Sequence, residues 1–367
     1  MRCIAPISQW RRSPSGCAGL VVALAVVAMA CSNDGGSTGS TGGGTLFTQA
    51  PAFNSTVLSI APAGDGSGRL YVGGDFTTYN GTEVTRLIRL NPDGTIDPAF
   101  ATGFGVNGSV RSIAPAGDGS GNVYVGGDFT SYNGTVVTRL VRLHADGTMD
   151  PVFVTGVGFN SSVRSIVPAG DRSGNVYVGG DFTSYNGTPA NGLVRLHANG
   201  TVDLIFVTGA GFTGAGLNSG VRSIAPAGDR SGDLYVGGSF TNYNGTPVND
   251  LVRLNADGTV DQAFATGMGF NDTVFSIAPA GDGSGNVYVG GAFISYNGTV
   301  ANDLVRLHAN GTVDPAFATG TGFNDTVFSI APAGDGSGNV YVGGQFTKYQ
   351  SLTIGRIARL KSNGSAD

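Results

Sequence analysis

Apolar and polar residues alternate over short stretches of this chain, and glycine-rich turns separate those stretches. Within residues 110–153, enrichment in β-branched and aromatic residues predicts four strands. These strands cover Val110–Ala114, Asn122–Val125, Leu140–Leu143 and Thr148–Phe153. Turns are expected between them, at 118–121, 132–134 and 146–147. No stretch keeps the 3.6-residue period of an amphipathic helix, so the pattern indicates an all-β fold.

This unit recurs six times. The segment Ser-Ile-Ala-Pro-Ala-Gly-Asp returns with one substitution, and its aspartates are Asp65, Asp118, Asp171, Asp229, Asp282 and Asp335. Successive aspartates are 53 residues apart, except for one spacing of 58 that follows from five extra residues near 211–217. Four short strands in about 50 residues correspond to one blade of a β-propeller.

The two ends of the chain complement each other. The last repeat stops at Asp367, which matches Asp314, and the missing part of that unit aligns with residues 45–54. Residues 45–367 number 323, which is six repeats of 53 plus the five-residue insertion. We therefore expect a six-bladed β-propeller over residues 45–367, closed by pairing of its N- and C-terminal segments, because closure leaves no open sheet edge.

The blade sequence carries a family resemblance. The string Val-Gly-Gly-Asp-Phe-Thr, followed by Tyr-Asn-Gly, Arg-Leu and Asp-Gly-Thr-x-Asp-Pro-x-Phe, resembles the delta-60 repeat, a bacterial β-propeller repeat of unknown function. Residues 118–125 also resemble the hairpins of NHL-type propeller repeats. The delta-60 resemblance covers residues 45–367. It implies the fold and an exported or cell-surface protein, and it brings no catalytic residues with it.

The N-terminal segment predicts export. Residues 1–30 combine arginines at positions 2, 11 and 12 with the apolar run Gly19–Ala30, which is typical of a signal peptide. Ala28-Met29-Ala30 fits a signal-peptidase site and also resembles a lipobox before Cys31. We favour lipidation of Cys31, because a Gly/Ser-rich tether follows it and ends at residue 44. The expected location is the outer membrane or cell surface; the alternative is a secreted or periplasmic protein.

The charge and cysteine content of the chain limit the kinds of binding partner and cross-link that we expect. The net charge is −5 and no basic patch with interleaved aromatic residues occurs, which argues against nucleic acid. Membrane contact is expected only through the lipid anchor, and the chain is expected to be a monomer. Cys3 and Cys17 fall in the leader, so the mature chain keeps only Cys31 and cannot form an internal disulfide.

The turn between the third and fourth strands fixes a register. Asn91–Thr95 suits a three-residue loop with Gly94 in the left-handed region. This loop places an arginine opposite an aspartate in each repeat and predicts one cross-strand ion pair per blade. The pairs are Arg89/Asp97, Arg142/Asp150, Arg195/Asp203, Arg253/Asp261, Arg306/Asp314 and Arg359/Asp367.

The sequence contains no compelling metal, cofactor or catalytic residues. His144, His197 and His308 occupy equivalent turn positions in separate repeats, so a polar turn role is favoured over a metal site. The Asp-Gly-Ser-Gly loops offer one carboxylate each, whereas calcium needs six to eight oxygens, so ordinary hairpin turns are favoured there.

Positions that differ between the repeats say more about contacts and binding than the positions that all six repeats share. The residue after Val-Gly-Gly and one residue of the first strand change together around the ring, which predicts contacts between adjacent blades. The predicted inter-blade pairs are Asp75/Arg111, Asp128/Arg164 and Asp181/Arg222. The remaining positions, Leu58, Phe275 and Phe328, form a candidate apolar binding patch. Duplication of the first three repeats explains the same pattern without contacts.

Three functions fit these observations. The favoured one is a non-catalytic binding or adhesion scaffold for a protein or glycan at the bacterial envelope, because nearly every polar group is copied six times and catalysis needs a unique constellation. An enzyme acting on envelope or extracellular glycans is the alternative, and it needs two suitably spaced carboxylates. A purely structural envelope protein is the third. The variable stretches after each Asn-Gly-Thr, such as 83–86, 189–192 and 247–250, are candidate recognition loops.

Overall fold

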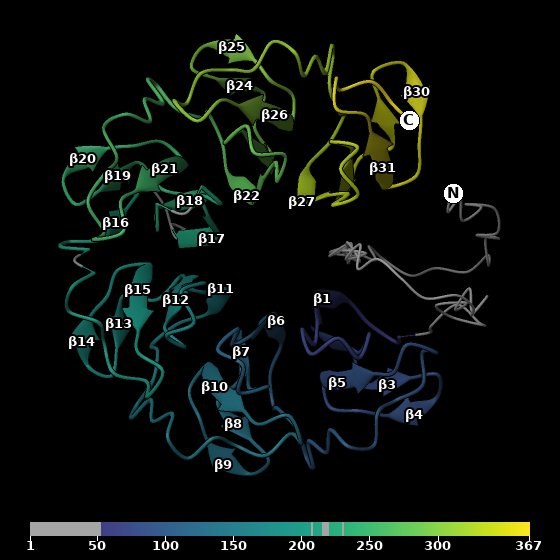
Figure 1. Cartoon of the computed structure of the whole chain (residues 1–367), viewed down its shortest axis with the longest axis vertical. Helices are drawn as coiled ribbons and strands as arrows, with labels where there is room; N and C mark the ends of the chain where they lie inside the picture. The colour runs from purple at the N-terminus through teal and green to yellow at the C-terminus, as the bar shows by residue number, and fades with distance from the viewer. Residues whose placement is uncertain (1–52, 207, 215–219, 230) are drawn as a thin grey trace, which may run out of the picture.

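The computed structural model describes residues 53–206, 208–214, 220–229 and 231–367. Within them, six three-stranded antiparallel sheets are arranged in a ring (Figure 1). The innermost strands are β1 (Val57–Pro62), β6 (Val110–Pro115), β11 (Val163–Pro168), β17 (Gly220–Pro226), β22 (Val274–Pro279) and β27 (Val327–Pro332). The middle strands are β2 (Leu70–Gly74), β7 (Val123–Gly127), β12 (Val176–Gly180), β18 (Leu234–Ser239), β23 (Val287–Gly291) and β28 (Val340–Gly344). The third strands are β5 (Leu87–Leu90), β10 (Leu140–Leu143), β15 (Leu193–Leu196), β21 (Leu251–Leu254), β26 (Leu304–Leu307) and β31 (Ile357–Leu360). The predicted six-bladed propeller is confirmed.

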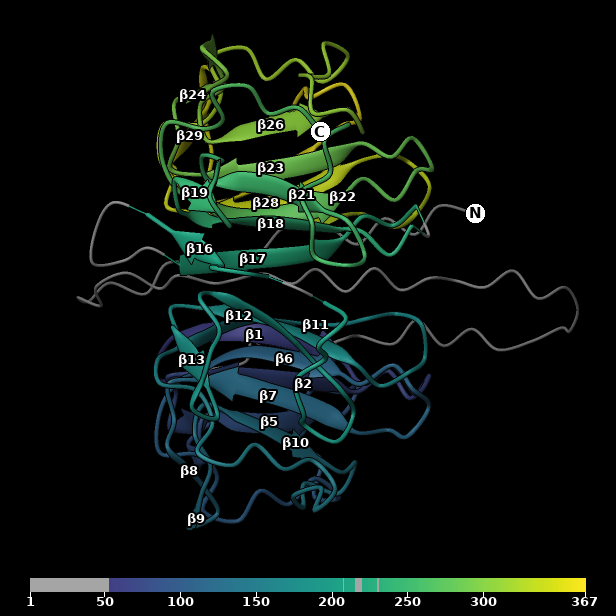
Figure 2. The same cartoon turned by 90° about the vertical axis from the view of Figure 1, so that its left-hand side faces the viewer.

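Each blade also carries a short hairpin between its middle and third strands. The hairpins are β3 (Thr78–Tyr79) with β4 (Thr82–Glu83), β8 (Ser131–Tyr132) with β9 (Thr135–Val136), β13 (Ser184–Tyr185) with β14 (Thr188–Pro189), β19 (Asn242–Tyr243) with β20 (Thr246–Pro247), β24 (Ser295–Tyr296) with β25 (Thr299–Val300), and β29 (Lys348–Tyr349) with β30 (Leu352–Thr353). In the fourth blade β16 (Phe212–Thr213) pairs with β19. Figure 2 shows the hairpins toward one face of the ring.

The hairpins form where the sequence predicted only a turn. Asn80 and Gly81 both have positive φ, 48° and 80°, as a two-residue hairpin loop requires. The buried Tyr79 hydroxyl donates a hydrogen bond of 2.6 Å to the Gly94 carbonyl, which ties the hairpin to the Asp-Gly turn of the same blade. The Tyr-Asn-Gly motif therefore forms a hairpin and anchors it.

The predicted fourth strand, 148–153 in the second blade, is wrong in its length. Only Met149 pairs, through one isolated bridge to Leu143, and the chain then turns away. The cause is the side chain of Asp150, whose Oδ1 accepts the backbone N–H of Val152 at 2.9 Å and bends the chain. The bridge nevertheless has the predicted register, because Leu143 lies opposite Met149 and the Asp150 N–H donates to the Arg142 carbonyl.

The hydrophobic core lies between successive blades. One cluster joins Tyr71 and Leu87 of the first blade to Val110 and Val125 of the second, and all four side chains are buried. Glycine permits this close approach, because a Cβ added to Gly73 would lie 2.3 Å from Cγ1 of Val110. Burial of each such aliphatic side chain contributes about 1.5–3 kcal/mol, so the interfaces between blades carry much of the stability.

A row of hydrogen bonds seals the inner strands. The hydroxyl of Ser59 in β1 accepts the N–H of Ile113 in β6 at 3.0 Å, and Ser112 accepts from Ile166 at 3.0 Å. In the same way the N–H groups of Ile224, Ile277 and Ile330 donate to the hydroxyls of Ser165, Ser223 and Ser276, respectively, each at 3.1 Å. An inner strand presents unpaired amides at its edge, so this row satisfies one amide in each of five inner strands and couples neighbouring blades.

Among the described residues, the ring is not closed between the sixth and first blades. Inner strands pack against their neighbours from β1 through to β27, whereas β27 and β1 stand apart in Figure 1. The predicted closing pairing involves residues 45–52 and lies outside the described residues, as do the predicted signal peptide, Cys31 and the tether. The described part of the chain contains no helix long and apolar enough to cross a membrane.

Candidate functional site

The structure brings together all six arginine–aspartate pairs expected at the third strands. The Nε–Oδ2 distance is 2.7 Å for Arg89–Asp97 and Arg306–Asp314, 3.3 Å for Arg195–Asp203, and 3.4 Å for Arg142–Asp150 and Arg253–Asp261. Arg359 and Asp367 are also paired.

These pairs are structural. Arg89 lies over the rings of Tyr71 and Phe100, at 5.6 and 5.1 Å, and its Nη1 donates to the Ala145 carbonyl of the next blade at 2.6 Å. Burial acts against ionisation of Asp97, but hydrogen bonds from the Ala99 N–H and from Arg89 keep the pKa of that carboxyl below its usual value. The arginine therefore joins two blades while its charge is neutralised.

The Asp-Gly-Ser-Gly loops use their carboxylates within the turn. Oδ1 of Asp118 accepts the backbone N–H of Ser120 at 2.9 Å and also its hydroxyl, while Oδ2 lies 2.7 Å from Nη2 of Arg142. Both oxygens of this carboxylate are thus engaged by the protein, as a turn-forming role requires.

The inner strands share a second feature, a β-bulge near the hairpin face. In β6 the register shifts between Val110 and Ser112, so Arg111 is the bulged residue. The same shift occurs in the other five inner strands. The bulged residues are Leu58, Arg111, Arg164, Arg222, Phe275 and Phe328, and we call them the inner ring. A bulge redirects a side chain and marks many functional positions.

Two of the three predicted inter-blade pairs are wrong. Arg111 binds Asp128 of its own blade, with Nη2 and Oδ2 2.6 Å apart, and Arg164 binds Asp181 of its own blade at 2.5 Å. In both blades this aspartate directly follows the middle strand that pairs with the inner strand carrying the arginine, so the arginine finds a carboxylate within its own blade. In the fourth blade Ser239 occupies that position and offers no carboxylate.

The third predicted pair is present. Nη1 of Arg222 lies 3.1 Å from Oδ1 of Asp181 in the preceding blade, so Asp181 bridges two arginines. Asp75 crosses a blade boundary by a different route and accepts a hydrogen bond from the Ser109 hydroxyl at 2.5 Å. One arc of the inner ring is therefore a network of alternating charges.

The other arc is aromatic. Phe275 and Phe328 come from adjacent blades, and their rings meet edge to face with centroids 5.2 Å apart. Both side chains are only half-buried. Leu58, the third member of the predicted patch, lies on β1, across the opening from β27 (Figure 1). The structure thus joins the two phenylalanines and leaves Leu58 on the far side of the opening.

Two acidic residues lie just before third strands: Asp250, at the end of the variable stretch 247–250 named above, precedes β21, and Asp303 occupies the equivalent position in the next blade. Asp303 precedes β26 and is only 7% exposed. Burial, reinforced by the Asp325 and Asp272 carboxylates, raises the pKa of Asp303 to about 7. Burial likewise raises the pKa of Asp250, at the equivalent position in the preceding blade, to about 6, although its Oδ1 accepts the Phe240 N–H. Arginine occupies this position in the first, second and sixth blades and glycine in the third, so the acids are confined to the fourth and fifth blades.

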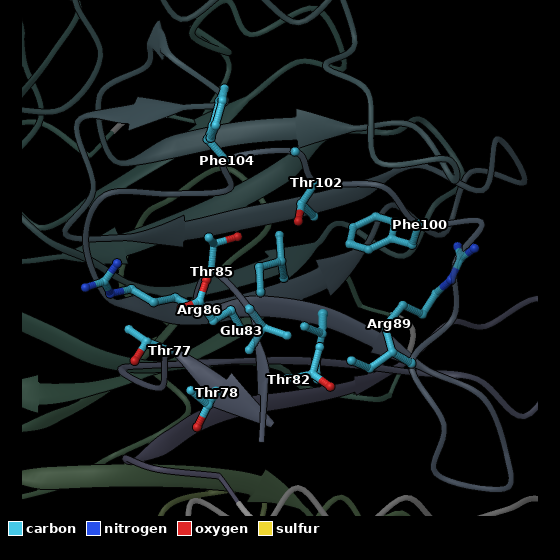
Figure 3. A pocket seen from close by; sticks show the side chains of 15 residues that line it. Thr77, Thr78, Thr82, Glu83, Thr85, Arg86, Arg89, Phe100, Thr102 and Phe104 are labelled. Atoms are coloured by element: carbon cyan, nitrogen blue, oxygen red, sulfur yellow. The ribbon is translucent and has the colours of Figure 1, made fainter. Parts of the chain in front are cut away.

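The first blade contains a groove of about 640 Å³. Figure 3 shows Phe104, Thr102 and Phe100 along one side and Thr77 and Thr78 along the other. The groove lies between the β3–β4 hairpin and the segment that leads to the second blade. Its volume is in the range of small-molecule sites.

The sequence-based prediction named part of this groove without recognising it. Residues 83–86 were singled out as a variable stretch, and Glu83 and Arg86 line the groove. A signal was present, because Glu83 is the only glutamate of the chain. The opposite wall, including Phe104, comes from the connection between two blades, and its approach to Glu83 depends on how that connection folds.

Comparisons with known proteins agree with the fold. Six segments match the family described as "Domain of unknown function (DUF5122) beta-propeller", namely residues 66–100, 119–153, 172–206, 231–264, 283–317 and 336–367. No curated protein matches the chain.

Among solved structures, one similar chain is the extracellular domain of a B. thetaiotaomicron protein described as a one-component system. It is 17% identical over 78% of this chain and 30% of its own length, with a TM-score of 0.47. This chain therefore spans about a third of that protein. The WD40 β-propeller domain of Doa1 is 14% identical over 86% of this chain and 90% of its own, with a TM-score of 0.44. Since the six matched segments cover more than half of the sequence and each lies within one blade, the chain belongs to the DUF5122 β-propeller family.

Proposed function

We propose that this protein is an exported, non-catalytic binding scaffold, held at the outer membrane or cell surface by a lipid on Cys31, and that it takes its ligand at the inner ring. The delta-60 resemblance of its repeats and the signal-like leader support export. The main observation in support of a ligand site is that the inner ring has two chemically different sides. Phe275 and Phe328 form an aromatic arc on one side, and Arg111 and Arg164 lie opposite.

This division favours an amphipathic ligand. The half-buried ring pair offers an apolar surface whose contact with a ligand releases water. The arginine–aspartate network offers donors and acceptors for a polar end. A ring of six identical blades would have the same chemistry on every side. Because the repeats have diverged, the site has an apolar side and a charged side and can orient an amphipathic ligand.

A fluorescent amphipathic anion, 1-anilinonaphthalene-8-sulfonate, tests the inner ring. We expect the folded protein to bind about one probe molecule, with blue-shifted emission, and expect Phe275→Ala and Phe328→Ala to weaken that binding. Phe104→Ala is the matched control, since it removes an exposed aromatic ring far from the inner ring. Absence of saturable binding, or equal loss in the control, rejects the inner-ring site and favours a purely structural protein.

The anchor is tested separately. The full-length protein should fractionate with membranes, and Cys31→Ala should release it into the soluble exported fraction. Membrane association that is unchanged by Cys31→Ala would reject the lipid anchor.

A glycan-acting enzyme is the second candidate, and Asp303 is the observation that favours it. A carboxyl that keeps its proton near neutral pH beside the exposed carboxylates of Asp272 and Asp325 meets one requirement of general acid catalysis. Release of reducing ends from bacterial cell-wall glycan, abolished by Asp303→Asn, would favour the enzyme over the scaffold.

A further inference from the structure

We propose that the groove on the first blade is a second binding site, and that its ligand is a neutral saccharide of one or two sugar units. The groove lies beside the β3–β4 hairpin and involves none of the inner-ring residues. It therefore does not depend on the function proposed above.

The first argument is the presentation of Phe104. This ring is 84% exposed, an unusual state for a phenylalanine. Its backbone is fixed, because the Phe104 N–H donates to Oδ1 of Asn133 in the next blade at 3.1 Å, and Gly103 and Gly105 on either side have φ near 58°. The aromatic face is thus held open on a rigid loop, as a stacking surface for the C–H face of a sugar requires.

The second argument is Glu83. Its carboxylate forms no hydrogen bond or ion pair within the described part of the chain, and it lies on the groove wall. The equivalent positions of the other repeats are all uncharged: Val136, Pro189, Pro247, Val300 and Thr353. A carboxylate accepts several hydrogen bonds at once, so it can hold two adjacent sugar hydroxyls.

The third argument is that further hydrogen-bonding side chains line the groove around Phe104 and Glu83. The hydroxyls of Thr78, Thr82 and Thr102 line the groove, and each can both donate and accept a hydrogen bond. Arg86 adds a guanidinium whose Nη1 is held by the Val106 carbonyl at 3.3 Å. Polyhydroxylated ligands match this mixture of donors and acceptors beside one apolar face, and the opposite charges of Glu83 and Arg86 give the groove no net charge that would favour an ionic ligand.

The repeats provide a comparison within the molecule. Met268 occupies the position of Phe104 in the fourth blade, is also exposed, and has its N–H held by Asn297 at 3.1 Å in the same way. Val136 occupies the position of Glu83 in the second blade. The scaffold of the site is thus copied, while the aromatic ring and the carboxylate come together in the first blade.

The test is an array of bacterial and plant oligosaccharides probed with the labelled full chain, followed by calorimetric titration of the strongest saccharide. Phe104→Ala and Glu83→Gln should each weaken binding about tenfold or more, as expected for loss of about 1.4 kcal/mol of interaction. Met268→Ala and Val136→Ala, the matched changes in other blades, should leave the affinity unchanged.

The outcome separates this site from the inner ring. Saccharide binding that is retained in Phe275→Ala but lost in Phe104→Ala supports the groove site. This holds whether or not the fluorescent anion binds at the inner ring. Absence of any bound saccharide, or binding that tolerates both Phe104→Ala and Glu83→Gln, overturns the proposal. A thermal unfolding midpoint close to wild type for both groove variants ensures that lost binding reports on the site.

Discussion

Nε of Arg306 lies 2.7 Å from Oδ2 of Asp314, and the two side chains are only 8% and 4% exposed. The equivalent residues of the last blade, Arg359 and Asp367, are also paired but are 30% and 27% exposed. The repeat architecture thus contains the same ion pair in a buried and a partly solvated form.

This difference in burial predicts unequal costs for the same mutation. Asp314→Asn leaves a buried arginine uncompensated and should lower the free energy of unfolding by about 3 kcal/mol or more. Asp367→Asn should cost under about 1 kcal/mol, because water solvates the remaining charge. Urea denaturation of both variants measures the difference, and equal losses would show that burial does not govern these pairs.

The contact between blades predicts intolerance at one glycine. A Cβ added to Gly237 would lie 2.5 Å from Cγ1 of Val274 and 2.7 Å from Cδ1 of Ile277 in the next blade. Gly237→Ala should therefore destabilise the protein by about 3 kcal/mol. The control is Gly355→Ala, because no other heavy atom lies close to its added Cβ. A wild-type thermal midpoint for Gly237→Ala would contradict the packing described between blades.

Asp303 predicts a pH dependence of stability. Its folded pKa of about 7 exceeds the ordinary value of 3.8, so the folded protein binds this proton more tightly than the unfolded chain does. The resulting stability is fully present below about pH 4 and is lost as the pH rises through 7. Asp303→Asn removes this dependence, so it should stabilise the protein more at pH 8 than at pH 5, by about 2 kcal/mol.

A turn carboxylate provides the control for that measurement. Asp257 is fully exposed, and hydrogen bonds from Thr259 lower its pKa, so it stays ionised over the same pH range. Asp257→Asn should change stability equally at pH 5 and pH 8. A stabilisation by Asp303→Asn that does not grow with pH would mean that Asp303 is ionised in the folded protein.

The last blade predicts how the ring closes. In the other five blades a phenylalanine lies edge-on against the middle-strand tyrosine, at 5.1–5.3 Å, as Phe317 does against Tyr288. The equivalent Tyr341 is only half-buried, and Ile357 is 49% exposed where the other blades have fully buried leucines. By repeat alignment the matching phenylalanine is Phe47.

We therefore expect Phe47→Ala to destabilise the whole propeller by about 3 kcal/mol, as loss of a buried phenylalanine does elsewhere. Thr48→Ala, a neighbouring change, should be close to neutral. Thermal unfolding of the full-length chain provides the measurement, and a neutral Phe47→Ala would show that the N-terminal segment does not complete the last blade.

Much of this architecture could be predicted from the repeat. The spacing of Asp65 and its equivalents fixed the number of blades, and the loop at 91–95 gave the register that places Arg89 beside Asp97. The number of blades follows from counting the repeats, and the register depends on local turn geometry, which a single repeat contains in full. The early end of the fourth strand was missed because a side-chain hydrogen bond of Asp150 bends the chain there. Strand propensities of single residues do not include such a hydrogen bond.

The candidate sites were harder to predict for a different reason. Arg111 was assigned to Asp75 of the preceding blade, whereas it binds Asp128, which directly follows the strand paired with its own. Phe104 and Glu83 are 21 residues apart in sequence and become neighbours of one groove only through the path of the blade connection. Contacts that depend on tertiary path, rather than on local pattern, need the structure.

The hydrogen bonds between serine hydroxyls and isoleucine amides of neighbouring inner strands have a consequence for the evolution of such a protein. The second to fifth blades each bring one hydroxyl acceptor for the blade after and one amide donor for the blade before, as Ser112 and Ile113 do. Copying a repeat copies both halves of the coupling. A ring of this kind can therefore gain or lose a whole unit without compensating substitutions, and single blades remain free to diverge toward new ligands.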